Sequence, residues 1–585
     1  MPPGRPSGLT GHGRRRLLSL LGIAIALVLQ MLAIDGQSLV GDAPYHLLAG
    51  HQALRYGQNT LNLEHPPLVK LLGALPLLAE PPLAPPLTVD RAFPAAFAVF
   101  EDPALVHRVR WRTGLLLLAF VGLPLGVALW LLGRALWRPV EGLALLLIVG
   151  LSFSVFPYLV TLQTDGGAML GYTASLAGAT LLQRRPTLGN ALVLGLGAGI
   201  ALAAKFSALL LLPAVVLAPL LAPATARRRA ALAAAAAAVA IIVPAATYAF
   251  ANRHDDDSAA RRAIASYTAG SGTLDVGDAL DRWRKPLLQL AEVSPSAAQY
   301  ALGVLGIRAQ SERGVYASYA FGHLSSRGRW WYFPAVLAVK LPLAILLASL
   351  AAALAFLRSR RNRPEADTRP TRAPLAALLL CGLTAAIYLG AAMASSYNLG
   401  MRHLLPIVPV LYLPAARWAA ARPRRLAILA TALALEALLL TPRWIAATNT
   451  WWLGDANPTR LALSHSNLES HQSFVALARE AERHGWAPLH VVYPGLRPEE
   501  LAAYLPTARL ASAEAGIERP AWYAVNVAVA QLLPALLPEP PPDLHRGPEL
   551  SRQAARWAPL WTELQTCEHH GFHAGTFVIS HCKGN

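Results

Sequence analysis

The sequence has few charged residues for its length. Asp, Glu, Lys and Arg make up 14% of the 585 residues, whereas they make up about 25% of a typical soluble protein. Hydrophobic residues account for 55%. So few charges cannot cover the surface of a soluble protein of this size. The composition therefore excludes an ordinary soluble fold and indicates an integral membrane protein.

Acidic residues are the scarcer of the two charged classes. The chain has 33 Asp and Glu residues against 51 Lys and Arg, which gives a formal net charge of +18. An excess of this sign also suits a nucleic-acid partner, but most of the arginines form short clusters between apolar runs. Such clusters are typical of the cytoplasmic loops of membrane proteins. We therefore interpret the charge as a sign of topology and predict no nucleic-acid partner.

Cysteine is rare, with three residues in the whole chain. Cys381 lies within an apolar run, whereas Cys567 and Cys582 lie close together near the C-terminus. These two can form a disulfide if that end of the chain faces an oxidising compartment. Two free thiols are the alternative, and the sequence does not decide between them.

Long apolar runs, by contrast, are abundant. A helix needs roughly 20 apolar residues to cross a bilayer. Eleven stretches come close to that length: 17–34, 113–133, 140–159, 166–182, 188–204, 206–223, 230–251, 334–357, 373–393, 403–420 and 425–442. The first run follows GHGRRR and lacks a small-residue cleavage motif, so we expect an uncleaved first helix.

The basic clusters orient these spans. With the N-terminus in the cytoplasm, every short cluster falls in a cytoplasmic joint: Arg134 and Arg138, Arg184 and Arg185, Arg227 to Arg229, Arg358 to Arg372, and Arg422 to Arg425. Three arginines at 108, 110 and 112 lie on the outer side, but in a long loop, where the rule is weak. We predict a multi-pass protein of the bacterial inner membrane with a periplasmic C-terminus.

The expected fold class is an α-helical polytopic membrane protein with a soluble α/β domain at its C-terminus. The transmembrane domain covers 1–442, with outer loops at 35–112 and 252–333, and the periplasmic domain covers 443–585. In the first outer loop, PYHLLAGHQALRYG and PPLVKLLGALPLL are too short to span, so we expect helices lying in the membrane interface. After residue 487, β-rich runs (LHVVYP, AWYAVNV, GTFVIS) alternate with helical ones and predict the α/β domain.

Polar residues are concentrated in the first outer loop, directly after the first span. They are Asp42, His46, Glu64, His65 and Lys70. The predicted topology brings Asp165 and Arg402 to the same face of the membrane. A carboxylate can activate an acceptor hydroxyl or amine while cations hold a phosphate leaving group, so this set suits transfer from a lipid phosphate.

The pattern Asp42-x-x-x-His46, followed by EHPPLVK up to Lys70, resembles the first outer loop of family 39 membrane glycosyltransferases. This group has the GT-C fold and includes the protein O-mannosyltransferases and the aminoarabinose-lipid A transferase. Similar segments continue along the chain: TLQTDGG around Asp165, AAKFSALL around Lys205, FGHLSSRGRWWYFPAVLAVKLPL up to Lys340, and SSYNLGMRHLLPIVP around Arg402.

The resemblance implies a polyprenyl-phosphate-linked sugar as donor and a single inverting displacement with Asp42 as general base. Lys70 and Arg402 would stabilise the leaving phosphate. The acceptor is open: a protein, lipid A, a wall polymer or another glycolipid. The family includes metal-dependent and metal-independent chemistry, so a divalent metal is compatible with the sequence but not required by it.

The chain departs from the family pattern in two places. Ala43 stands where relatives commonly have an acidic residue, which puts the catalytic details in question. At 469–472 the chain has Glu-Ser-His-Gln where many relatives have Asp-Trp-Gly-Gln.

Each candidate residue also has a structural interpretation. Asp42 and Asp165 can cap helices, and Glu64 and His65 can start an interfacial helix. The lysines at 70, 205 and 340 can reach lipid headgroups. Arg402 stands at a helix start, where a cation is unfavourable, so we favour a phosphate contact for it.

Two further clusters have a metal-binding composition: Asp255 to Asp257, and the histidines 569, 570 and 573. Their spacing is unconvincing for a metal site, so we interpret both as solvated surface.

Two rival functions remain. A transporter or flippase for lipid-linked sugars would need polar residues distributed through the bundle midplane, with discontinuous helices and internal repeats, whereas this chain concentrates its polar residues at one face. A noncatalytic protein that binds lipid-linked glycans is the second rival, and Ala43 favours it. We predict a glycosyltransferase that acts at the periplasmic face.

Overall fold

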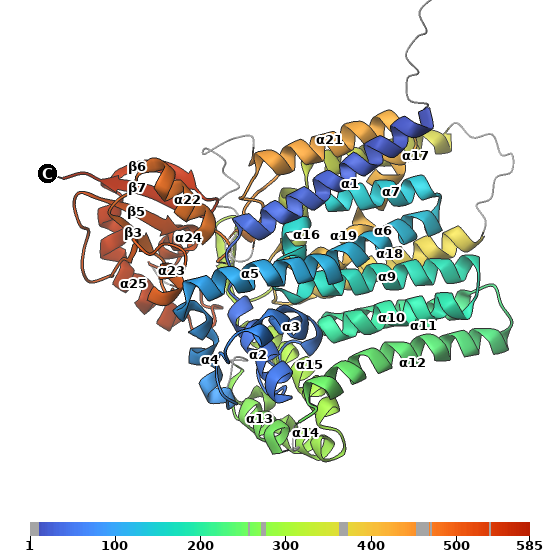
Figure 1. The fold of residues 1–585 in the computed structure, drawn as a ribbon, viewed down its shortest axis with the longest axis horizontal. Coiled ribbons are helices and arrows are strands. Elements are labelled where there is room, and N and C mark those ends of the chain that lie inside the picture. Colours follow the sequence, from blue (N-terminus) through green and yellow to red (C-terminus); the bar gives the residue numbers. More distant parts are fainter. Residues whose placement is uncertain are drawn as a thin grey trace, which may run out of the picture.

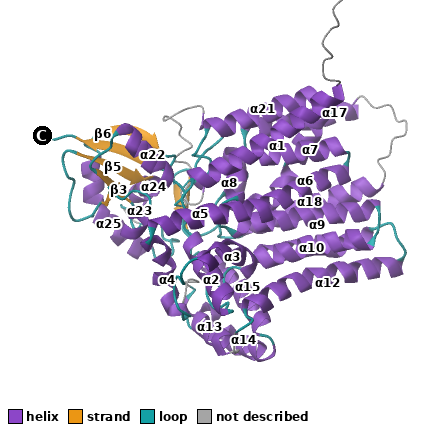
Figure 2. Cartoon of the chain, viewed as in Figure 1, coloured by secondary structure: helices purple, strands orange, loops and turns teal. Residues whose placement is uncertain are grey.

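The computed structural model describes residues 11–254, 258–270, 276–361, 372–451, 467–468, 471–537 and 540–584. Helices run side by side in one bundle, and a sheet lies beyond one end of it (Figure 1 and Figure 2). The α9–α10 and α11–α12 turns lie at the opposite end of the bundle from this sheet (Figure 1). Asp255 to Asp257, Glu469 and Ser470 lie outside the described residues.

The bundle is built from helices that often contain a break. Its elements are α1 (Gly11–Gly36), α5 (Pro103–Leu117), η4 (Leu118–Gly122), α6 (Leu123–Leu136), α7 (Pro139–Gly150), α8 (Phe156–Leu159), α9 (Thr164–Arg184), α10 (Leu188–Ala204), η5 (Phe206–Leu211), α11 (Leu212–Leu221), α12 (Ala226–Ala251), α16 (Tyr332–Lys340), α17 (Leu343–Arg361), α18 (Arg372–Ala394), η7 (Met401–Ile407), α19 (Val408–Leu411), α20 (Leu413–Ala420) and α21 (Pro423–Leu439).

Each predicted span is largely helical, but the described residues contain only four continuous helices long and apolar enough to cross a membrane. They are Ser19–Gly36, Pro103–Leu136, Ala226–Ala251 and Leu375–Ala394, and α16 with α17 adds a fifth if the bent pair counts as one span. The predicted span 403–420 is divided into η7, α19 and α20, each with a proline. The number of eleven spans therefore stays a prediction.

One face of α17 shows why the bundle suits a lipid environment. Leu343, Leu347, Leu350, Leu354 and Leu357 are all exposed. Their spacing of three or four residues places them on one side of the helix. Such a stripe is unfavourable in water and favourable against acyl chains.

The break between α16 and α17 is held by the segment that follows α21. The two helices are bent by 105°, and the break frees backbone carbonyls that need partners. The Asn449 side-chain amide donates to the carbonyls of Ala338 and Leu341, at 2.5 and 3.1 Å. Its backbone N–H donates to the Val339 carbonyl at 2.8 Å. Asn449 therefore satisfies the broken end of α16.

The two outer segments form a layer of short helices at one end of the bundle. The first contains α2 (Ala43–Tyr56), α3 (Pro67–Ala74), η1 (Leu75–Ala79), η2 (Val89–Arg91), α4 (Ala92–Ala95) and η3 (Ala96–Glu101). The second contains α13 (Ser258–Thr268), η6 (Gly277–Leu280), α14 (Asp281–Val293), α15 (Pro295–Arg313), β1 (Ser318–Ala320) and β2 (His323–Ser325).

The polar side chains of α2 are buried. His51 and Gln52 are 0% and 1% exposed, and the Gln52 side chain donates to the Pro85 carbonyl at 2.9 Å. The rest of the outer segment folds over this side of the helix. The interfacial position of α2 stays a prediction.

A five-stranded mixed sheet lies in the C-terminal part of the chain, in the order β4-β3-β5-β7-β6. Strand β3 pairs parallel with β4 and β5, and β7 pairs antiparallel with β5 and β6. The elements are α22 (Phe474–His484), β3 (Leu489–Val492), α23 (Pro498–Ala502), β4 (Arg509–Leu510), β5 (Ala521–Asn526), α24 (Val527–Leu536), α25 (Gly547–Leu564), β6 (Glu568–His573) and β7 (Phe577–Cys582). Cys567 and Cys582 form a disulfide.

Candidate functional site

A cavity of about 260 Å³ lies where the first outer segment meets the bundle. Its lining includes charged and titratable side chains: Asp42, Glu64, His65, Lys205 and Arg402. It also includes many aromatic and apolar ones: Phe206, Leu210, Ile307, Tyr316, Phe333, Tyr388, Tyr397 and Leu399. A cavity that offers both kinds of side chain suits an amphiphilic ligand.

Asp42 and Arg402 form an ion pair in this cavity. The two residues are 360 positions apart in the sequence, and the Arg402 Nη1 to Asp42 Oδ2 distance is 2.6 Å. Asp42 occupies the N-cap position of α2, with proline in the first turn, but its side chain makes no capping hydrogen bond. Helix capping therefore does not account for the Asp42 carboxylate, which is turned toward Arg402 instead.

The environment keeps Asp42 ionised. Burial within the site would raise the pKa of this carboxyl, but the charge of Arg402 and its hydrogen bond outweigh that effect and hold the pKa well below its usual range. The Asp42 side chain is still 45% exposed, whereas that of Arg402 is 11% exposed. A ligand in the cavity can therefore reach the carboxylate.

A second ion pair lies at the cavity wall. Lys205, at the end of α10, contacts Asp165, in the first turn of α9. The Asp165 side chain is 4% exposed and that of Lys205 is 12% exposed. Lys205 also lines the cavity, so the buried carboxylate positions a cation at its edge.

Two histidines from the predicted set contact each other beneath Asp42. The rings of His46 and His65 meet edge to face at 5.0 Å, and the His46 Nδ1 lies 3.0 Å from the Asn62 Oδ1. Because the amide oxygen accepts, His46 must carry a proton on Nδ1. Burial lowers the pKa of His46 to about 4, so the ring is neutral near pH 7. His65 lines the cavity, and His46 supports it from below.

Lys70 has a structural contact that the sequence did not reveal. Its side chain is buried, and Nζ donates to the Asn62 carbonyl at 2.8 Å. The backbone of Lys70 packs against Gly50, where an added Cβ would lie 2.1 Å from the Lys70 carbonyl oxygen. Lys70 thus ties α3 to the loop that carries Glu64 and His65, and Lys205 takes the place at the cavity wall.

Lys340 was predicted to bind substrate, but its ammonium group contacts backbone carbonyls instead. Its Nζ donates to the carbonyls of Ile445, Ala447 and Asn467 at 2.7, 2.6 and 2.6 Å. Three carbonyl acceptors occupy the three N–H groups of a lysine. The position of Lys340 at a helix end is typical of a lysine that contacts headgroups or substrate. The segment after α21 folds back instead, and its carbonyls accept hydrogen bonds from the ammonium group.

The loop that presents Asp42 is held by the C-terminal part of the chain. The backbone N–H of Ser38 donates to the Gln472 carbonyl at 3.0 Å, and that of Leu39 donates to the Tyr504 hydroxyl at 3.0 Å. The Phe474 N–H donates to the Ser38 hydroxyl at 3.2 Å. These contacts fix the backbone just before Asp42.

Sequence reasoning missed several residues that line the cavity. Tyr397 and His403 stand within the motif around Arg402, and Ser207 stands within the motif around Lys205. Their positions in these motifs could have identified them as candidates. Gln310 and Tyr316 belong to the second outer segment and stand in no motif that could have identified them. Tyr397 donates to the Gln310 side chain, which joins these two parts of the wall.

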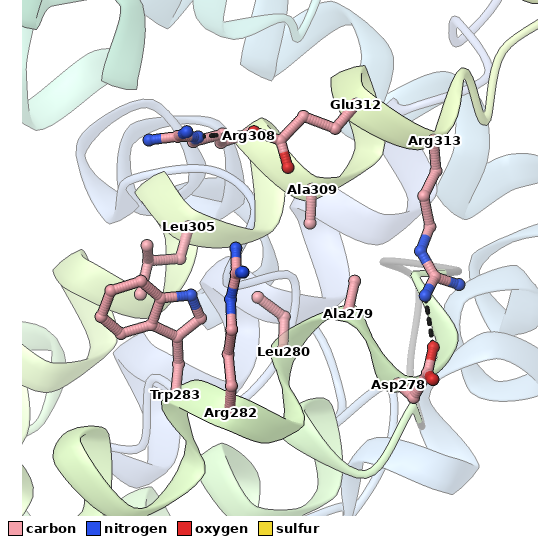
Figure 3. Close-up of a pocket in the computed structure, with 10 residues that line it drawn as sticks. All are labelled: Asp278, Ala279, Leu280, Arg282, Trp283, Leu305, Arg308, Ala309, Glu312 and Arg313. Carbon is pink, nitrogen blue, oxygen red and sulfur yellow. Dashed lines mark hydrogen bonds and ion pairs between the residues drawn. The ribbon is translucent and has the colours of Figure 1, made fainter.

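A larger cavity of about 560 Å³ lies between η6, α14 and α15 (Figure 3). Arg313 contacts Asp278 at one side, and Arg308 contacts Glu312 at 2.7 Å. The ring of Trp283 lines the same space near Arg282 (Figure 3). The cavity contains no residue of the predicted site.

Comparison with known proteins gives structural matches alone, since neither a family model nor a curated protein matches the chain. The oligosaccharyltransferase of Archaeoglobus fulgidus, solved with Zn and sulfate, is similar at 11% identity over 97% of this chain and 73% of that chain, with a TM-score of 0.40. ArnT from Cupriavidus metallidurans, solved with undecaprenyl phosphate, is similar at 14% identity over 96% and 97%, with a TM-score of 0.32.

These two proteins are GT-C glycosyltransferases, the group that the sequence motifs indicate. With TM-scores below 0.5, the similarity assigns no residue and no substrate to this chain.

Proposed function

We propose that this chain is a membrane glycosyltransferase that moves a sugar from a polyprenyl-phosphate donor to an acceptor hydroxyl or amine. The observation that carries the proposal is the cavity lined by the Asp42–Arg402 ion pair, by Lys205 and by several aromatic side chains. The charged side chains suit a phosphate and the reacting centre, and the aromatic and apolar ones suit the start of an isoprenoid chain. The choice of donor follows the family resemblance of the motifs.

The reaction is a single displacement at the anomeric carbon. The acceptor oxygen or nitrogen attacks that carbon, and its proton passes to the Asp42 carboxylate. The bond between the anomeric carbon and the phosphate oxygen breaks, and the polyprenyl phosphate leaves with the bonding electron pair. Arg402 and Lys205 stabilise the negative charge that develops on the phosphate. A displacement of this kind inverts the sugar configuration.

The ion pair between Asp42 and Arg402 explains how the base is controlled. A carboxylate whose pKa is held low by an arginine is a weak base. A donor phosphate near Arg402 competes for the same guanidinium, which raises the proton affinity of Asp42. The base therefore becomes strong when the leaving group is in place, and Ala43 removes no group that this scheme requires.

Periplasmic placement of the site is part of the proposal. The Cys567–Cys582 disulfide supports an oxidising compartment at the end of the bundle where the C-terminal sheet lies. The short arginine clusters of the α9–α10 and α11–α12 turns lie at the other end, as the positive-inside rule asks of the cytoplasmic side.

Transfer by the purified full-length protein tests the proposal. The protein is incubated with a panel of undecaprenyl-phosphate sugars, and release of undecaprenyl phosphate is followed. We expect turnover with at least one donor and a loss of about 100-fold or more in Asp42→Asn. The matched control is Asp278→Asn, because Asp278 also pairs with an arginine but lies in the other cavity, with its side chain 88% exposed.

Two results would contradict the proposal. Full turnover in Asp42→Asn would place the base elsewhere. Absence of turnover with every donor, together with retained binding of undecaprenyl phosphate, would favour a noncatalytic binding protein or a flippase.

A further inference from the structure

The β6–β7 hairpin brings together three side chains that the sequence did not group. Glu568, His570 and His581 each offer one ligand atom, and these atoms lie within 4.8 Å of one another. Among the described residues, this is the group of His, Cys, Asp and Glu side chains that approaches metal-site spacing. The sequence had drawn attention to His569, His570 and His573, and only His570 belongs to the cluster.

Strand register explains the grouping. Trp522 of β5 lies opposite His581 of β7, and His581 lies opposite Glu568 of β6. Directly opposed residues of antiparallel strands place their side chains on the same face of the sheet. His570 has no opposite residue on β7, because the pairing shifts between His569 and Gly571. Its ring contacts Trp522 at 4.9 Å, and its Nε2 lies 3.9 Å from the Glu568 Oε1.

The other two histidines of the hairpin have different partners. The His569 Nδ1 lies 2.8 Å from the Ser580 hydroxyl oxygen, and the His573 Nδ1 lies 2.7 Å from Glu480. The structure thus separates one histidine of the cluster from two neighbours that sequence spacing cannot distinguish.

Neighbouring groups hold the cluster in place. The Trp522 indole stacks on the His581 ring at 4.3 Å and contacts the His570 ring at 4.9 Å. The Cys567–Cys582 disulfide joins the residues directly next to Glu568 and His581. Lys583 contacts the Glu568 Oε2 at 2.7 Å, and Oε1 lies 3.9 Å from the His570 Nε2. Two rings and one carboxylate oxygen are therefore arranged before any ligand binds.

We propose that Glu568, His570 and His581 form a binding site for a divalent transition-metal ion, with zinc as the expected occupant. Two imidazoles and one carboxylate are a common zinc ligand set, and they leave a fourth position open. Ligand atoms around a tetrahedral zinc lie roughly 3.3 Å apart, so atoms that now lie within 4.8 Å of one another must approach by up to about 1.5 Å. Side chains 36% and 50% exposed, as His570 and Glu568 are, can make that movement.

Metal titration of the full-length protein tests the site. Protein purified in detergent with its disulfide intact is stripped with a chelator and titrated with Zn²⁺ by calorimetry. Co²⁺ absorption serves as a second readout of tetrahedral geometry. Loss of even an outer partner of a metal site commonly costs about 10-fold to 100-fold in affinity. We expect His570→Gln and His581→Gln each to weaken Zn²⁺ binding by at least about 10-fold.

His569→Gln is the matched control, because it removes a histidine from the same hairpin without touching the cluster. It is expected to bind Zn²⁺ like the unchanged protein. The metal-free melting temperature of each variant shows whether the hairpin still folds. Equal Zn²⁺ binding in the unchanged protein and a His570→Gln/His581→Gln double variant that melts normally would overturn the proposal. An equal loss in His569→Gln would overturn it as well.

Discussion

Replacement of Lys340 by methionine separates the role that the sequence suggested from the one that the structure supports. Lys340 is 1% exposed, and its ammonium donates to three backbone carbonyls of the segment after α21. Methionine fills a similar volume but donates no hydrogen bond. The carbonyls of Ile445, Ala447 and Asn467 would then lose a partner in a buried place.

The size of the effect follows from these three contacts. Each buried acceptor left unpaired costs about 1–3 kcal/mol. Removal of a buried ammonium returns part of its desolvation cost, which is several kcal/mol for a buried ion. The net loss is about 2–4 kcal/mol. That is a large part of the roughly 5–15 kcal/mol by which folded domains are stable.

The assay is thermal unfolding in detergent, followed by size-exclusion chromatography of the heated samples. We expect the midpoint of Lys340→Met to fall by several degrees, while the KM for the donor in the folded fraction stays unchanged. Lys285→Met is the control, because Lys285 is an exposed lysine on α14. A normal midpoint with a raised KM would refute the structural role and restore Lys340 to the substrate site.

Two further predictions concern the cavity. Lys205→Met alone should destabilise the protein by about 3 kcal/mol because it leaves the buried Asp165 unpaired. In a double-mutant cycle, Lys205→Met/Asp165→Asn should recover most of this loss. Additive changes in the free energy of unfolding would contradict a coupled pair. Because burial lowers the pKa of His46 from 6.5 to about 4, the unfolded chain takes up this proton first as the pH falls, so stability is lost between about pH 6.5 and 4. The loss at pH 5 is about 2 kcal/mol relative to pH 7, and chemical unfolding of His46→Gln should show a flatter pH dependence than that of the unchanged protein.

The sequence by itself determined the class of the protein and part of the site. The low fraction of charged residues and the long apolar runs identify a membrane protein, because helix length and hydropathy depend on local composition. The motifs also pointed to Asp42, Glu64, His65, Lys205 and Arg402, which line one cavity. These residues stand in motifs whose local sequence is distinctive.

The tertiary structure decided where the remaining polar side chains go. Lys70 and Lys340 carry the same charge as Lys205, but carbonyls from other segments bind their ammonium groups. The bend at the end of α16 depends on Asn449, more than a hundred residues later. Strand register likewise places Glu568 opposite His581, and the shift in pairing between His569 and Gly571 leaves His570 beside them. Each outcome depends on contacts between residues far apart in the sequence. A local sequence pattern does not indicate which distant group will be the hydrogen-bond partner.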